Sequence, residues 1–136
     1  MRVVFDTNVL ISALVWPRGV PAQVVALARQ GRVHSVTSPV LLEELRWVLQ
    51  GKLGFQEDPV EAMIEVIIAH SEVVVPRHAL HAVQTDPEDN RVLECALEGR
   101  ADAIVTGDHH LLELGTFREI PLLTPREFLS LVSPSP

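Results

Sequence analysis

The chain has 136 residues, of which 47% are hydrophobic and 21% are charged, and its formal net charge is −7. This length suits one domain that buries its core without disulfides, and the composition excludes an intrinsically disordered chain. The acidic balance argues against a broad basic surface for nucleic acid, because such binding depends on cations that neutralise phosphates. We expect a single domain over residues 1–132 and a disordered tail at 133–136.

The strand and helix patterns alternate along the whole chain. The expected strands are 2–5, 33–37, 72–75, 103–106 and 121–123. The expected helices are 8–15, 21–30, 40–49, 59–70, 87–98, 109–114 and 125–132. A strand followed by a helix, repeated, predicts a parallel sheet covered by helices on both faces. The fold class is therefore α/β, with three layers and a central parallel five-stranded sheet.

The single cysteine, Cys95, excludes an internal disulfide, so the fold does not need an oxidising compartment. Met1 and Arg2 lead directly into a strand pattern, which does not resemble a signal peptide. No apolar stretch approaches the ~18 residues of a membrane span. We expect a cytoplasmic protein without a membrane partner.

Two aspartates follow short apolar runs. Asp6 ends the first expected strand, and Asp108 comes shortly after the fourth. Ligands of an open parallel sheet bind beyond the carboxyl ends of the strands, where the strand order reverses. If the first and fourth strands flank that reversal, both side chains point into one crevice.

Helical phase, at about 100° per residue, selects two further acids. Glu44 lies at the edge of the apolar stripe of its helix and can face inward, whereas Glu43 should face water. Asp89 falls close to the centre of the stripe of the helix that begins at Pro87. Asp86 precedes that proline and reads as the helix N-cap, with a possible contact at the rim of the site.

Each acid also has a structural reading. Asp6 or Asp108 alone is more often a helix cap than a catalyst, Asp89 could favour the helix dipole, and Glu44 could pair with an arginine. The four acids Asp6, Glu44, Asp89 and Asp108 come from separate elements that the topology sends to one place, where they would repel one another unless cations sat among them. An all-oxygen ligand set suits Mg²⁺ or Mn²⁺ better than zinc.

These residues resemble the PIN-domain nucleases, and within them the toxins of toxin–antitoxin pairs. The resemblance covers nearly the whole chain. It rests, in the family's order, on "FDTNVLISAL" with Asp6 and Asn8, "SPVLLEELRWVL" with Glu44, "TDPEDNRVLECAL" with Asp89, and "ADAIVTGDHHLL" with Thr106 and Asp108. Any one string is a weak signal, but four in order are a strong one.

The resemblance implies a sheet of order 3-2-1-4-5, hydrolysis of RNA phosphodiesters with a divalent metal, and homodimers inhibited by a small antitoxin. The four acids would hold one or two Mg²⁺ or Mn²⁺ ions that activate water and neutralise the scissile phosphate. Asn8 and Thr106 would orient carboxylates or water, and Asp86 would support them from the rim.

Two histidines that follow Asp108 and the two tryptophans of the chain could also serve a function. His109 and His110 could suggest histidine ligation, although exposed polar residues at a helix start are the commoner case. The phase of Trp47 points it outward, which favours a protein interface or base stacking, while packing under a neighbouring loop fits equally well. We predict a protein–protein contact there. Trp16, in a loop near the mouth of the site, stays ambiguous.

Two other function classes compete with a nuclease. A receiver-type signalling domain would need an aspartate after the third strand and a lysine after the fifth, where this chain has Pro76 and Thr124. A PIN-like module that binds RNA or a protein without cutting fits the acidic surface but not the intact set of acids. The RNA target, any activity on single-stranded DNA and the number of metal ions stay open.

Overall fold

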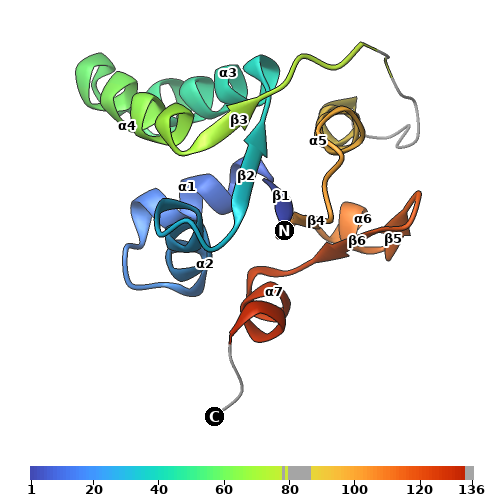
Figure 1. Ribbon diagram of the computed structural model, residues 1–136. Helices are drawn as coiled ribbons and strands as arrows, with labels where there is room; N and C mark the ends of the chain where they lie inside the picture. The colour runs from blue at the N-terminus through green and yellow to red at the C-terminus, as the bar shows by residue number, and fades with distance from the viewer. Residues whose placement is uncertain (78, 80–86, 134–136) are drawn as a thin grey trace.

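The computed structural model describes residues 1–77, 79 and 87–133 and shows a sheet between layers of helices (Figure 1). Its strands are β1 (Arg2–Phe5), β2 (His34–Thr37), β3 (Ser71–Val73), β4 (Ala103–Val105), β5 (Thr116–Phe117) and β6 (Ile120–Leu123). Its helices are α1 (Thr7–Val15), α2 (Val20–Arg29), α3 (Pro39–Trp47), the π-helical η1 (Val48–Lys52), α4 (Glu57–Ala69), α5 (Pro87–Glu98), α6 (His109–Leu112) and α7 (Pro125–Val132). Of the expected tail at 133–136, residues 134–136 lie outside the described part.

The strand order is β3-β2-β1-β4-β6-β5, so the expected order 3-2-1-4-5 is confirmed with β6 as the fifth strand. The pairs β2–β3, β1–β2, β1–β4 and β4–β6 are all parallel, with Val4 opposite Val36 on one side and Ile104 on the other. The expectation of five strands is one short, because β5 adds an antiparallel edge strand of two residues. A strand that short leaves no alternating pattern for sequence reasoning to detect.

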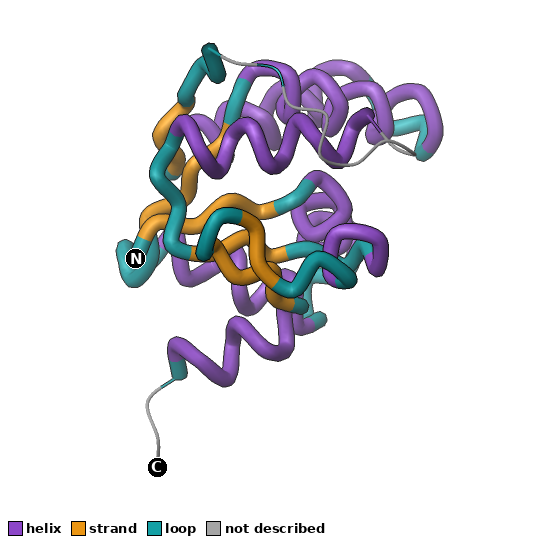
Figure 2. The backbone as a smooth tube through the Cα atoms, turned by 90° about the vertical axis from the view of Figure 1, so that its right-hand side faces the viewer, coloured by secondary structure: helices purple, strands orange, loops and turns teal. Residues whose placement is uncertain are grey.

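Successive residues of the central strands supply two separate hydrophobic cores. Val3 and Phe5 face a core shared with α1, α2, α3, α4 and α7, whereas Val4 and Ile104 face a core shared with α5 and α6. This alternation is the two-residue period of a strand that is buried on both faces. The strands accordingly run between helices on two sides (Figure 2), and the expected three-layer fold is confirmed.

The helices begin where capping chemistry predicts. Ser38 caps α3, with Pro39 as its first residue, and Thr124 and Glu127 form a reciprocal capping box at the start of α7. The start of α5 at Pro87 was also expected, but the expected cap Asp86 lies outside the described residues. In the described part no single helix has the length and apolarity to cross a membrane, although α1 and α2, with a bend of 102° between them, meet that test as a pair.

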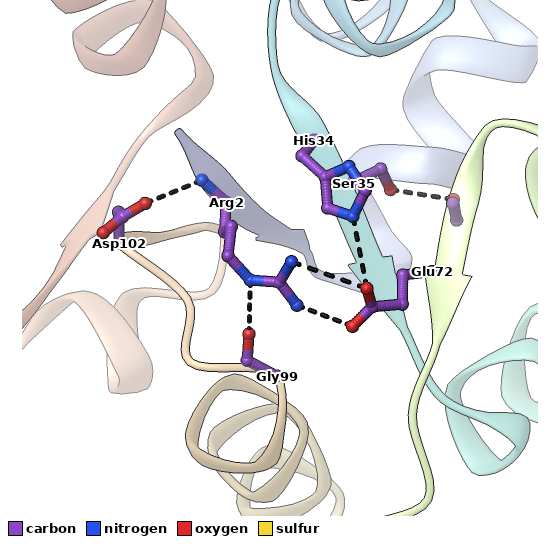
Figure 3. Close-up of polar contacts among 7 residues, drawn as sticks. Arg2, His34, Ser35, Glu72, Gly99 and Asp102 are labelled. Carbon is purple, nitrogen blue, oxygen red and sulfur yellow. Dashed lines mark hydrogen bonds and ion pairs between the residues drawn. The ribbon is translucent and has the colours of Figure 1, made fainter.

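Arg2 joins several elements at the amino-terminal edge of the sheet (Figure 3). Its Nε donates to the Gly99 carbonyl at the end of α5 at 2.7 Å, and its Nη2 lies 2.6 Å from Glu72 Oε2 on β3. Its backbone N–H donates to Asp102 Oδ2 at 2.7 Å, just before β4. Arg2 of β1 thus connects β3, the end of α5 and the start of β4 at the amino-terminal edge of the sheet.

Candidate metal and nucleic-acid site

The four predicted acids line one cavity of about 260 Å³ beyond the carboxyl ends of β1 and β4. The strand order reverses at this point, because β2 lies on one side of β1 and β4 lies on the other. Asp6 follows β1, Glu44 lies on α3, Asp89 lies in the first turn of α5, and Asp108 precedes α6. The topology therefore brings together carboxylates that are up to 102 positions apart in the sequence.

Asp6 is buried and held by three hydrogen bonds. Only 6% of it is exposed, and its carboxylate accepts hydrogen bonds from the Thr7 backbone N–H at 2.7 Å, Asn8 Nδ2 at 3.0 Å and Thr106 Oγ1 at 2.7 Å. Burial nevertheless raises the pKa of Asp6 above its usual value, the hydrogen bonds lower it only in part, and the nearby Asp108 raises it further. The site thus holds a carboxylate whose charge a cation would stabilise.

Asp108 is linked to the opposite side of the crevice by hydroxyl and amide groups. Its backbone N–H donates to Thr106 Oγ1 at 3.0 Å, and Asn8 Oδ1 accepts from the Gly107 N–H at 3.0 Å. Its own carboxylate accepts from the His110 N–H at 2.8 Å, as an N-cap does. Asp6 caps α1 in the same way, so both aspartates are caps and line the cavity as well.

The phase assignments for α3 and α5 agree with the burial of these residues. Glu44 is half-buried and accepts a hydrogen bond from Thr7 Oγ1 at 3.2 Å, whereas Glu43 is exposed and forms an ion pair with Arg46. Asp89 is 5% exposed, close to its expected place at the centre of the apolar stripe. Periodicity alone therefore separated the cavity-lining glutamate from its neighbour.

The donor set of the cavity suits a hard divalent cation, since the described residues that line it include four carboxylates and no histidine or cysteine. Within residues 1–77, 79 and 87–133 no three acidic, histidine or cysteine side chains converge closely enough to hold one ion directly. Mg²⁺ commonly keeps several of its waters and takes only one or two carboxylates directly. The oxygen donors around this cavity fit that mode of binding.

Sequence reasoning missed two polar residues of the cavity, Thr7 and Lys52. Thr7 precedes the expected helix at 8–15, and its hydrogen bond to Glu44 depends on the packing of α1 against α3. Lys52 follows the expected helix at 40–49, whereas η1 continues from α3 and brings it to the cavity. Its one available signal was that it is the only lysine in the chain.

The tryptophans and the histidine pair His109 and His110 do not line the acid cavity. Trp47 is 59% exposed, as its phase predicted, and Trp16 is 64% exposed on a separate surface pocket with Ser12 and Arg18. His109 and His110 are exposed at the start of α6, which agrees with the structural reading given to them. Asp86, expected at the rim, is outside the described residues.

Comparison with known proteins decides the family. The family model described as PIN domain matches residues 2–110 of this chain. The chain belongs to the PIN domain family. This PIN domain is 30% identical over 140 residues to an uncharacterized protein of Methanocaldococcus jannaschii, covering 95% of this chain and 90% of that protein.

Two solved structures share the fold of this PIN domain. One is VapBC2 of Rickettsia felis bound to a DNA fragment from its promoter, with a TM-score of 0.65, 14% identity, and coverage of 91% of this chain and 98% of that chain. The other is VapBC-1 of nontypeable Haemophilus influenzae, with a TM-score of 0.63, 17% identity, and coverage of 93% and 99%. At these identities the likeness is one of fold, and it spans almost the whole chain.

Proposed function

We propose that this PIN domain is an endoribonuclease that needs Mg²⁺ or Mn²⁺ and hydrolyses RNA phosphodiester bonds. The supporting observation is that carboxylates from four separate elements line one cavity beyond the carboxyl ends of the strands. Such a concentration of acid is unfavourable unless cations neutralise it. A phosphate-rich substrate would be repelled by the same charges, so the cations would serve both the protein and the RNA.

Asp6, Glu44, Asp89 and Asp108 would hold the metal and form the catalytic set. When bound, the metal would activate a water molecule and neutralise charge on the scissile phosphate and the leaving 3′ oxygen. Thr106 and Asn8 each donate to Asp6 Oδ2, which fixes the orientation of that carboxylate. Thr7 does the same for Glu44. Asp86 keeps its proposed supporting role at the rim.

The proposed cellular role is that of the toxin in a toxin–antitoxin pair. Its support is the fold shared with VapBC2 and VapBC-1 over more than nine-tenths of this chain. The role implies a small cognate antitoxin protein, a homodimer and a cytoplasmic location where cellular RNA is accessible. Co-expression with the product of a short neighbouring reading frame would test the pairing, with rescue of growth as the supporting result.

A PIN-like module that binds RNA or a partner without cutting is the second candidate. The net charge of −7 favours it, since it weakens the approach of RNA, and so does the finding that no three metal-ligating groups of the described residues converge on one point. RNA binding without metal-dependent cleavage would support this alternative over the enzyme.

The test of nuclease activity uses a pool of unstructured RNAs with and without Mn²⁺. Wild type and Glu43→Gln should cleave in Mn²⁺ and not in EDTA, whereas Glu44→Gln should be slower by at least two orders of magnitude. The two glutamines remove the same charge from adjacent residues, and only one of them lines the cavity. Equal rates for the two variants would exclude Glu44 from the catalytic set. Asp6→Asn and Asp89→Asn should behave like Glu44→Gln.

A further inference from the structure

The π-helical segment η1 brings Trp47 and Lys52 together beside the acid cavity. Lys52 Nζ lies 4.9 Å from the centroid of the Trp47 ring, a distance at which a cation is attracted to the face of an aromatic ring. Lys52 also lines the cavity formed by the four acids. The pair therefore joins an exposed aromatic surface to the candidate site.

The wider helical turn accounts for this pairing. Leu53 N–H donates to the Val48 carbonyl at 2.9 Å, an i to i+5 bond in place of the usual i to i+4 bond. In a π-helical turn residue 52 lies one turn after residue 47, on the same side of the helix. In an α-helix residue 51 would occupy that position. Residue 51 is a glycine, and a Cβ built on it would lie 3.6 Å from Trp47 Nε1, so the indole packs directly against the backbone.

Among the described residues that line the acid cavity, only Lys52 is positively charged. Four carboxylates surround the cavity, yet in the described part of the chain Lys52 forms no ion pair with any of them. Its ammonium group lies over the indole instead. A lysine held at the edge of an acidic site, and not neutralised by it, is suited to contact a phosphate that enters the site.

Trp47 is well placed for a base next to that phosphate. More than half of it is exposed, on the same segment of chain as a cavity-lining lysine. Base stacking on an aromatic ring combined with a cation on the backbone is how proteins hold single-stranded nucleic acid. The sequence alone favoured a protein contact at Trp47, whereas its pairing with Lys52 beside the cavity favours RNA.

We propose that Trp47 and Lys52 are substrate-binding residues for single-stranded RNA: Trp47 stacks on an unpaired base, and Lys52 contacts a phosphate adjacent to the scissile one. This inference rests on the proposed nuclease function and names the substrate class of the same site. It also explains how a protein of charge −7 retains RNA, since the recognition is local and does not need a basic surface.

The test measures kcat/KM in Mn²⁺ on a labelled single-stranded RNA of about 12 nucleotides. We expect Lys52→Met to lower kcat/KM at least tenfold, mainly through KM, and Lys52→Arg to stay within about threefold of wild type. Arg29→Gln is the matched control, because it removes one exposed positive charge at the end of α2, on a pocket with His70 and Ser71 and away from the acids. Trp47→Ala should lose about fivefold or more, and Trp47→Phe should retain most of the activity.

Two further readouts separate binding of RNA from a structural role. In a Glu44→Gln background, RNA affinity should fall with Lys52→Met, and the slope of log affinity against log salt should flatten by about 0.7. Lys52→Met should not diminish the increase of melting temperature in Mn²⁺, because the lysine is not a metal ligand and the loss of its positive charge does not disfavour a cation. Binding of duplex RNA of the same sequence should not depend on Trp47, because its bases are not free to stack.

Each result bears on one of the two proposals. Cleavage by wild type together with normal rates and affinities in Lys52→Met and Trp47→Ala would overturn the inference and leave the nuclease function standing. Absence of cleavage by wild type would reject the nuclease function, and the affinity measurements would still decide the role of the pair. A Trp47→Ala variant that loses self-association in sedimentation but binds RNA normally would show a protein interface instead. Far-UV circular dichroism excludes misfolded variants.

Discussion

Thr106 Oγ1 donates a hydrogen bond to Asp6 Oδ2 at 2.7 Å and accepts one from the Asp108 backbone N–H at 3.0 Å. A single buried hydroxyl therefore sets the relative positions of two acids, one of which follows β1 and the other β4. The relationship spans 100 residues between Thr106 and Asp6. It fixes one edge of the site before any ligand enters.

Thr106→Val is expected to lower the free energy of unfolding by about 1–3 kcal/mol. The valine is close in shape but leaves the buried Asp6 carboxylate and the Asp108 N–H without this hydrogen-bond partner. Thr106→Ser keeps a hydroxyl and serves as the control. Urea unfolding of both variants measures the difference, and equal stability of valine and serine variants would mean that the hydroxyl does not matter.

Addition of Mn²⁺ or Mg²⁺ to the metal-free protein is expected to raise its melting temperature. Metal that binds only the folded state adds stability, about 2.7 kcal/mol when its concentration is 100 times the dissociation constant. Asp89→Asn should reduce the response, whereas Asp86→Asn should retain it, because asparagine caps a helix about as well as aspartate. Differential scanning fluorimetry during a metal titration gives the result, and a flat wild-type curve would contradict a metal site.

The raised pKa of Asp6 predicts how the stability of the metal-free protein depends on pH. The folded state binds the Asp6 proton more tightly than the unfolded state, so this contribution to stability is fully present below the usual pKa of 3.8 and is lost as pH rises through the folded value. The free energy of unfolding of wild type should therefore rise relative to that of Asp6→Asn as pH falls from about 7 to about 4.5 in EDTA.

The difference between these two proteins isolates Asp6. Hydrogen bonding from Arg2 lowers the pKa of Glu72 and acts in the opposite direction, but it is common to both proteins and cancels. A stability difference that stays constant across this pH range would show that Asp6 has an ordinary pKa.

Cys95 is expected to be unreactive in the folded protein. It lies on α5 and is fully buried in the core, and this burial raises the pKa of its thiol to about 12, while a hydrogen bond with Ser38 lowers it slightly. Iodoacetamide at about pH 8 should modify it only after urea unfolds the chain. Rapid labelling of the native protein would show that α5 opens away from the sheet.

Much of the site was predictable because periodicity and strand ends carry the information. The stripe of Leu41 and Leu45 fixed the phase of α3, and that phase distinguished Glu44 from Glu43. The apolar runs before Asp6 and Asp108 marked strands whose carboxyl ends meet in a parallel sheet. In each of these cases the pattern covers several residues and has one physical cause, the burial of apolar side chains.

The features that escaped prediction depend on contacts between elements or on subtle changes of the backbone. An α-helix was expected to continue through Val48 and Leu49, and a change to i+5 hydrogen bonds leaves the apolar pattern almost unaltered. The position of Lys52 follows from that change. The bond between Thr7 and Glu44 depends on how two helices pack, which no local pattern encodes.

The contacts of Arg2 lie at the edge of the sheet opposite the acid cavity. They join β1 to β3 and to the end of α5 at the amino edge, while the acids occupy the carboxyl edge of the same sheet. The Arg2 and Glu72 side chains are 33% and 44% exposed, so their ion pair adds little to overall stability. Arg2 connects β1, β3 and the end of α5 but does not line the acid cavity. An Arg2→Gln variant therefore removes contacts that hold these elements together and leaves the cavity-lining side chains unchanged, which separates the needs of the fold from those of the site.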